Sequence, residues 1–273
     1  INHCTFYNCQ AMNTDHAAIK LECDGLIANS VIVAPESHGA YRAIHVKDGW
    51  NVEAKNCLSF NYTKDSGGFR SAVKKVDCLM NTDPLFVDAV NGNFSFAVGS
   101  PALASGTNGT NMGDLRWNPS DIDDGIAYDF PSEDIPVEDE DSVEVIPTGK
   151  KLYVSPEGNN NNDGLTPATA KATFANVVSA ALAGDTIIMA DGLYSEAYVI
   201  NFEQLGVVVM AAEGAKPVIQ LTGNWTSLQL YATTTFDGIT FDGAATAYYL
   251  ISAKGAEAGT FTFKNCEFTN WNS

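Results

Sequence analysis

The sequence repeats one kind of short apolar run four times: Thr186-Ile-Ile-Met-Ala190, Val207-Val-Val-Met-Ala211, Leu228-Gln-Leu-Tyr-Ala232 and Tyr249-Leu-Ile-Ser-Ala253. The alanines that close these runs lie 21 residues apart each time. A second apolar series lies between them, at Val199-Ile200, Val218-Ile219, Ile239-Thr-Phe241 and Phe261-Thr-Phe263, with steps of about 20 residues. A fixed period near 20 is typical of solenoids, whose repeats bury their apolar faces against one another.

Two short strands in each period, separated by turns rich in Gly, Asp and Asn, predict an all-β chain. The expected arrangement is a parallel β-helix, a solenoid in which each coil of the chain adds one strand to each of several parallel sheets. Equivalent residues of successive coils then stack about 4.8 Å apart. One short capping helix is predicted near 173–183, because Thr173 is a suitable N-cap, apolar residues follow at helical spacing, and Gly184 ends the pattern.

A second landmark is a small residue that recurs in one local pattern. Its members are Cys4, Ser30, Cys57, Cys78 and Cys266. This recurrence predicts a ladder of small buried side chains, one per coil, in which cysteine acts as a small hydrophobe. Disulfides are the alternative, and the sequence gives no pairing. An asparagine precedes the landmark at Asn29, Asn56 and Asn265, and asparagine tolerates the left-handed backbone, so a structural stack of turns is expected.

Two longer segments carry motifs of their own. Residues 83–106 contain Asp83-Pro-Leu-Phe86 and Gly99-Ser-Pro-Ala102, and residues 152–194 contain Tyr153-Val-Ser-Pro156 and Gly184-Asp-Thr-Ile187. The first segment resembles the stretch that caps the last coil in right-handed parallel β-helix proteins of the pectate-lyase-like superfamily. The second resembles the opening of the same proteins, where a helix caps the first coil. The resemblance implies a right-handed solenoid and a secreted or cell-surface location.

The two segments occur in swapped order, which divides the chain into three parts. Residues 1–113 are expected to form closing coils and the closing segment, and residues 151–273 the cap and first coils. Residues 114–150 are predicted to be an acidic linker, with 11 Asp and Glu between 121 and 144 and no Lys or Arg over 117–149. Such a segment repels itself and stays extended.

With this order, the coil at the start of the chain and the coil at its end each need a neighbouring coil to cover their backbone and apolar side chains. Two arrangements satisfy them: stacking of the two coils within one chain, or stacking on another molecule. A head-to-tail contact between molecules does not close and builds a filament. We therefore expect other copies of the protein as partners through exposed end coils. The leading function is an extracellular, adhesin-like or filament-forming structural subunit.

The charge of the chain limits its other partners. The formal net charge is −18, from 15 Lys and Arg against 33 Asp and Glu. Nucleic acid and anionic membranes are excluded as partners, because they are bound through clustered Lys and Arg. No apolar run approaches the roughly 18 to 20 residues that span a bilayer. The sequence requires no cofactor, although the acidic linker leaves calcium binding open without showing the spacing of an EF-hand.

One cluster carries groups suited to catalysis, namely Arg42, His45 and Lys47. The resemblance implies a polysaccharide lyase, in which Lys, Arg or His abstracts the proton next to a uronate carboxylate. Because His45 and Lys47 alternate with Ile44 and Val46, both are predicted to face solvent, which explains them without catalysis. An acidic chain also repels a uronate polymer unless the site is locally basic. We expect a structural protein rather than an enzyme, with a secreted carbohydrate-active protein, lyase-like or glycan-binding, as the alternative.

Overall fold

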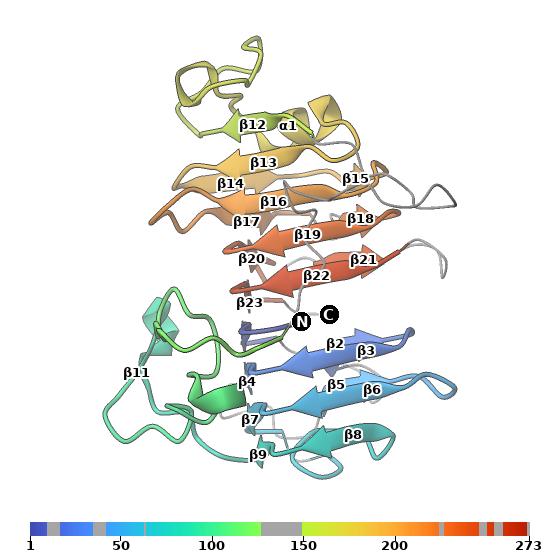
Figure 1. Cartoon of the computed structure of the whole chain (residues 1–273), viewed down its shortest axis with the longest axis vertical. Coiled ribbons are helices and arrows are strands. Elements are labelled where there is room, and N and C mark those ends of the chain that lie inside the picture. The colour runs from blue at the N-terminus through green and yellow to red at the C-terminus, as the bar shows by residue number, and fades with distance from the viewer. Residues whose placement is uncertain are drawn as a thin grey trace, which may run out of the picture.

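The computed structural model describes residues 1–9, 17–34, 42–62, 64–126, 149–223, 227–245, 250–253 and 259–271. These residues are mostly β, with several parallel sheets and a single α-helix, α1 (Phe174–Ala180). Three short 3-10 helices accompany them, η1 (Ala89–Asn91), η2 (Thr107–Gly109) and η3 (Pro167–Thr169). The strands lie one above another along the long axis of the molecule (Figure 1).

The largest sheet has eight strands, and every neighbouring pair in it is parallel. Its order is β14 (Leu193–Glu196), β17 (Val218–Leu221), β20 (Thr240–Asp242), β23 (Glu267–Thr269), β1 (Thr5–Tyr7), β4 (Val31–Val33), β7 (Leu58–Phe60) and β9 (Leu79–Met80). Strands from the end of the chain therefore lie beside strands from its beginning.

Four smaller parallel sheets complete the stack. The five-stranded sheet has the order β12 (Lys151–Val154), β13 (Thr186–Met189), β16 (Val207–Ala211), β19 (Thr234–Asp237) and β22 (Phe261–Lys264). The two three-stranded sheets are β15 (Ile200–Phe202), β18 (Leu228–Leu230) and β21 (Ile251–Ala253), and β3 (Gly25–Ala28), β6 (Val52–Lys55) and β8 (Val73–Val76). The fourth of these sheets has two strands, β2 (Ala17–Leu21) and β5 (Arg42–Val46). Along the chain, β13 to β23 visit the five-, eight- and three-stranded sheets in strict rotation.

This rotation corrects the predicted period. The first two apolar runs become β13 and β16 of the five-stranded sheet, whereas the last two contain β18 and β21 of a three-stranded sheet. Hydrogen-bonded partners lie further apart than 21 positions in this region: Thr186 pairs with Val208, 22 positions on, and Thr234 with Phe261, 27 positions on. One circuit thus contains three strands rather than two. The sequence pattern could not show this, because short apolar strands look alike whichever sheet they join.

The predicted ladder of small residues is confirmed. All six cysteines are free thiols, and Cys4, Cys57 and Cys266 are completely buried. The residue before each ladder position has a left-handed backbone, with φ between 47° and 50°, at His3, Asn29, Asn56, Asp77 and Asn265. A histidine and an aspartate therefore take the place that asparagine holds elsewhere in this row of turns.

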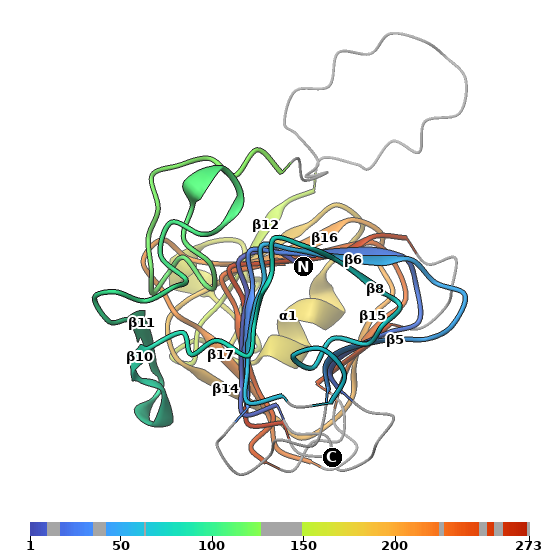
Figure 2. The ribbon, with the colours of Figure 1, turned by 90° about the horizontal axis from the view of Figure 1, so that it is seen from below.

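The predicted capping helix is confirmed as α1. Thr173 is its N-cap, and the Thr173 side chain accepts a hydrogen bond from the backbone N–H of Asn176. Phe174 and Val177 are fully buried, whereas Leu182, expected on the same face, is 60 % exposed because the helix ends before it. The helix packs against β12, β14 and β15 and lies inside the ring of strands when the molecule is viewed along its long axis (Figure 2).

The coils at residues 1–7 and 261–269 cover each other within one chain. β1 pairs with β23 in register, so that Thr5 lies opposite Glu267 and Phe6 opposite Phe268. The rings of Phe6 and Phe268 stack with centroids 4.5 Å apart. Asn2 forms parallel β-bridges with Lys264 of β22 on one side and with Ala28 of β3 on the other. These bridges connect the five-stranded sheet to the three-stranded sheet of β3, β6 and β8 across the same boundary. We call this boundary the junction. Of the two arrangements left open by the sequence, the structure has stacking within one chain, so these two coils are not exposed ends.

The closing segment lies elsewhere than expected. Residues 83–106 were predicted to cap the last coil, but they pack along the side of the stack (Figure 2). The antiparallel strands β10 (Phe86–Asp88) and β11 (Asn93–Phe96) begin this segment. Phe86 and Phe96 join a second apolar cluster formed by outward side chains of the eight-stranded sheet, including Val31 and Leu58. This outer sheet face is apolar because it is covered, and burial of its side chains holds the segment in place.

The ring stack at the junction can be tested by truncation. Phe268 is 7 % exposed and stacks on both Phe6 and Phe241, with centroids 4.5 and 5.1 Å away. Phe268→Ala should lower the free energy of unfolding by about 3–5 kcal/mol, measured by chemical denaturation, because it leaves a cavity between two coils. Tyr198→Ala, at an aromatic residue that is 82 % exposed, should change it by less than about 0.5 kcal/mol. Similar losses in both variants would contradict this account of the junction.

Candidate functional site

The predicted catalytic cluster lies on β5 and its edge, and the structure places its cations in ion pairs. The Arg42 guanidinium lies 2.5 Å from Asp65, and the Lys47 ammonium lies 3.0 Å from Glu22. Lys47 is exposed, as predicted from its alternation with the apolar residues of β5.

His45 differs from the prediction, because its side chain is buried rather than facing solvent. Only 8 % of it is exposed. Arg70 from the next circuit covers it, with Nη1 3.3 Å from His45 Nε2. A guanidinium can only donate, so His45 Nε2 accepts this hydrogen bond and carries no proton in this arrangement.

Three basic side chains occupy one position on successive circuits, and we call them the basic row: Lys20, His45 and Arg70. Lys20 of β2 is the register partner of His45 of β5. The bridge between Ile44 and Phe69 then places Arg70 beside His45. Sequence reasoning missed Lys20 and Arg70. The pattern that could have identified them is the constant step of 25 residues from Lys20 to His45 and from His45 to Arg70.

The face around the basic row is locally cationic. Its ion pairs join four cations, Lys20, Arg42, Lys47 and Arg70, to the three carboxylates Glu22, Asp48 and Asp65. The Asp48 side chain is 84 % exposed and that of Glu22 is 48 % exposed. Exposed ion pairs of this kind contribute only about 0–1 kcal/mol each, so a ligand carboxylate can replace them at small cost. The face can therefore hold an anion although the whole chain carries a net charge of −18.

A pocket of about 280 Å³ lies on the other side of the molecule, where the closing segment meets the eight-stranded sheet near the junction. We call it the junction pocket. Aromatic residues Tyr7, Phe94 and Trp117 line it together with Lys216 and Asp242. The Lys216 ammonium lies 3.2 Å from the centroid of the Trp117 ring, within the range of a cation–π contact. The chain's own lysine therefore occupies the aromatic face that a ligand would use.

A buried charge network adjoins this pocket through two of its lining residues, Trp117 and Glu267. Arg116 binds Asp114 through Nε and Nη2, at 2.9 and 2.7 Å from Oδ2, and reaches Glu267 at 3.3 Å. The Trp117 indole N–H also donates to Glu267. Burial, together with the nearby charge of Asp114, raises the pKa of Glu267 to about 8. One guanidinium thus serves two buried carboxylates, and a proton on Glu267 relieves the excess negative charge. The network fastens the start of the predicted acidic linker to β23, so residues 114–117 are packed against the sheets rather than extended as predicted.

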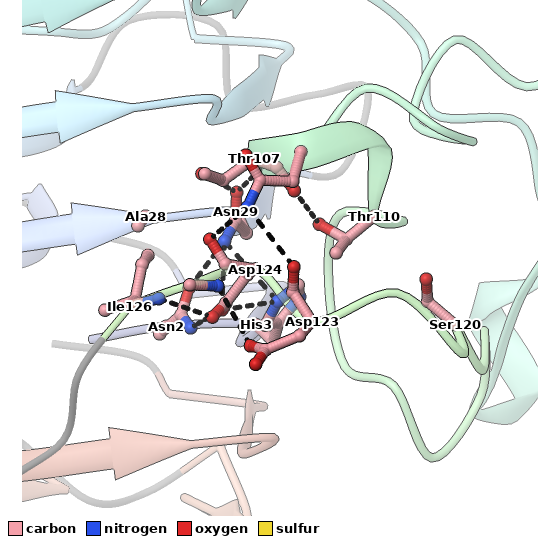
Figure 3. Close-up of polar contacts among 12 residues, drawn as sticks. Asn2, His3, Ala28, Asn29, Thr107, Thr110, Ser120, Asp123, Asp124 and Ile126 are labelled. Carbon is pink, nitrogen blue, oxygen red and sulfur yellow. Dashed lines mark hydrogen bonds and ion pairs between the residues drawn. The ribbon is translucent and has the colours of Figure 1, made fainter.

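A second buried polar cluster fastens the same segment to the row of left-handed turns (Figure 3). Asp124 Oδ2 accepts hydrogen bonds from Asn2 Nδ2 at 2.5 Å and lies 3.1 Å from His3 Nε2. Asn29 bonds to Asn2 on one side and receives the Thr107 backbone N–H on the other, at 2.9 and 2.7 Å. Burial lowers the pKa of His3. The hydrogen bonds of this cluster join protein groups to one another, and His3 Nδ1 has no hydrogen-bond partner among the described residues.

Other expected sites find limited support among the residues that the structure describes. These residues contain no group of three or more His, Cys, Asp or Glu side chains placed to hold a metal ion. Most of the acidic linker, residues 127–148, lies outside them, so the calcium prediction stays a prediction. Among the described helices, none is long and apolar enough to cross a membrane.

Comparisons with known proteins give a distant similarity to solved structures. No protein-family model matches the chain, and no curated protein sequence matches it. Among solved structures, a PL6 family alginate lyase, AlyGC, is similar with a TM-score of 0.35 and 16 % sequence identity. The similarity covers 91 % of this chain and 34 % of the lyase, so the chain spans about a third of that protein's length. A likeness at this level does not by itself assign an activity.

The raised pKa of Glu267 predicts a specific pH dependence. Its folded pKa of about 8 lies above the ordinary value of 4.5, so the folded state holds a proton that the unfolded state releases. Stability from this group is present below about pH 4.5 and falls as the pH rises to 8, by about 1.4 kcal/mol for each unit of difference. The lowered pKa of His3 acts in the opposite direction, because unfolded His3 gains a proton as the pH falls toward 6.5, and its effect fades as the pH rises above that value.

Glu267→Gln should therefore flatten the fall in unfolding free energy between about pH 6.5 and 8, measured by denaturant titration at each pH. Glu213→Gln, at an exposed carboxylate, is the matched control and should leave the wild-type slope unchanged. A slope that persists in the Glu267 variant would show that this carboxyl is ionised throughout.

Proposed function

We propose that this protein is a carbohydrate-active protein that binds an acidic polysaccharide across the outer face of β2 and β5. The observation that carries the proposal is the basic row, three basic side chains stacked in register on successive circuits of an otherwise acidic chain. Adjacent rungs lie about 4.8 Å apart. The two charged rungs, Lys20 and Arg70, lie on either side of the buried His45 and are therefore about 10 Å apart, so a polymer that carries several carboxylates can meet both at once.

We also propose that the stacked sheets form a right-handed parallel β-helix. The strict rotation of β13 to β23 among three sheets and the all-parallel pairing within each sheet support it. In this arrangement residues 151–273 supply the cap and first coils, residues 1–113 the later coils and closing segment, and residues 114–150 the connection between them. A secreted or cell-surface location fits such a protein and remains part of the proposal.

Polysaccharide lyase activity is the second candidate, favoured by the state of His45. Its Nε2 carries no proton and lies beside the Arg70 guanidinium, which gives the two groups that β-elimination needs. Arg70 would neutralise the uronate carboxylate, and His45 Nε2 would then accept the proton from the neighbouring carbon. Because His45 is only 8 % exposed, Arg70 must turn toward the ligand before this nitrogen can act.

The filament or adhesin role has less support from the geometry. Its argument depended on two uncovered coils, and β23 and β1 cover each other instead. At the end of the stack away from α1, the edge strand β8 carries Lys74 and Lys75, and Lys74 is exposed. Charged residues on an edge strand oppose its pairing with the edge of another molecule.

Binding can be tested with a polyuronate such as alginate or polygalacturonate, and with dextran as an uncharged polymer. Removal of both charged rungs in a Lys20→Ala, Arg70→Ala double variant should weaken polyuronate binding by about tenfold or more, measured by calorimetry at low salt. Wild-type affinity should also fall as salt rises, because the contacts are between exposed charges.

The matched control is Lys74→Ala with Lys75→Ala, which changes the net charge equally but on β8 of another sheet. It should change affinity by less than about twofold. Equal binding of dextran, or equal effects of the two double variants, would remove the basic row as the site. Lyase activity would appear as ultraviolet absorbance of an unsaturated product, and His45→Gln should abolish it while binding persists. Activity unchanged in that variant would exclude His45 as the base.

A further inference from the structure

We propose that Cys57 and Cys78 form a thiol–disulfide redox site, in which Cys78 is the attacking thiol and Cys57 the resolving thiol. A low-molecular-weight disulfide of the glutathione type is the oxidant. The product is an intramolecular disulfide between the last two rungs of the ladder of small residues.

The register of the strands places the two cysteines opposite each other. Leu58 of β7 pairs with Leu79 of β9, so the residues just before them, Cys57 and Cys78, occupy the same position on adjacent rungs. Adjacent strands are about 4.8 Å apart, within the range of Cα separations that a disulfide accepts. Both side chains point into the same core, since Cys57 is a member of it and Cys78 packs against it.

The two thiols differ in exposure in the way that a redox pair requires. Cys57 is completely buried, whereas Cys78 is partly exposed because β8 and β9 are the end strands of their sheets. A hydrogen bond from the Cys57 thiol to the sulfur of Cys78 lowers the pKa of Cys78 to about 7, whereas burial raises the pKa of Cys57. Near neutral pH, Cys78 is therefore the sulfur that is both ionised and accessible.

The exchange proceeds in two balanced steps. The Cys78 thiolate attacks one sulfur of the small disulfide, which forms a mixed disulfide and releases one small thiolate. Cys57 then loses its proton to solvent and attacks the Cys78 sulfur, which forms the Cys57–Cys78 bond and releases the second small thiolate. Two protein thiols are oxidised, and one small disulfide is reduced to two thiols.

The same chain supplies two internal comparisons. Cys4 and Cys266 are also opposite each other, since Thr5 pairs with Glu267, but both are completely buried at the junction. Cys23 is exposed but has no cysteine opposite it among the described residues, and partial burial with the nearby charge of Asp24 raises its pKa. We therefore expect Cys78 to react faster than the buried pair Cys4 and Cys266 and faster than the exposed single thiol Cys23.

The test is treatment of the folded protein with oxidised glutathione at about pH 7.5, followed by alkylation of free thiols and peptide mapping by mass spectrometry. A Cys57–Cys78 disulfide should form, with Cys23 reacting at least about tenfold more slowly and Cys4 and Cys266 remaining thiols. Cys57→Ser should stop the reaction at a stable glutathione adduct on Cys78, and Cys78→Ser should leave Cys57 unmodified. Ser30 occupies the same ladder position in the next circuit, so serine fits the site.

Three outcomes would overturn the proposal. In the first, Cys78 reacts no faster than Cys23. In the second, the wild-type protein stops at the glutathione adduct as the Cys57 variant does. In the third, the buried Cys4–Cys266 pair oxidises at the same rate, which would show that the position at the end of the stack has no effect.

Discussion

The structure depends on the parallel pairing of β23 with β1. This pairing joins residues separated by more than 250 positions and continues the hydrogen-bond ladder of the eight-stranded sheet without interruption. Its energy comes from two sources: backbone hydrogen bonds, such as Thr5 N–H to the Cys266 carbonyl at 2.9 Å, and the stacked rings of Phe6 and Phe268. Without it, each half would expose a row of unpaired backbone groups and an apolar layer, both of which favour pairing with another chain.

Two buried polar networks reinforce this boundary from outside. Arg116, at the start of the predicted linker, reaches Glu267 of β23, and Asp124 of the same stretch reaches Asn2 and His3 just before β1. Residues 114–126, which follow the closing segment, thus contact both sides of the junction. Buried charges of this kind are costly unless every member finds a partner. Their placement explains why the segment lies along the side of the stack rather than over its end.

Residues with a strong local preference were predicted well. Thr173 begins the helix because its hydroxyl accepts an N-terminal N–H, and Asn29, Asn56 and Asn265 adopt the left-handed backbone that asparagine tolerates. The predicted site was only partly right. Arg42 and His45 lie on β5 and Lys47 follows it directly, but His45 is buried beneath Arg70, which comes from a different circuit. A single strand pattern shows alternation and cannot show which side chain of the next circuit covers it.

The sequence by itself determined the β-rich class, the parallel stacking, the capping helix and the ladder of small buried residues. Each of these follows from local chemistry: apolar alternation, capping hydroxyls, and the small volume of cysteine and serine. Only the tertiary structure decided that one circuit contains three strands, that β23 receives β1 of the same chain, and that Lys20, His45 and Arg70 form one row. These features depend on register between distant segments, which is fixed by the summed packing of whole circuits rather than by any residue's own preference.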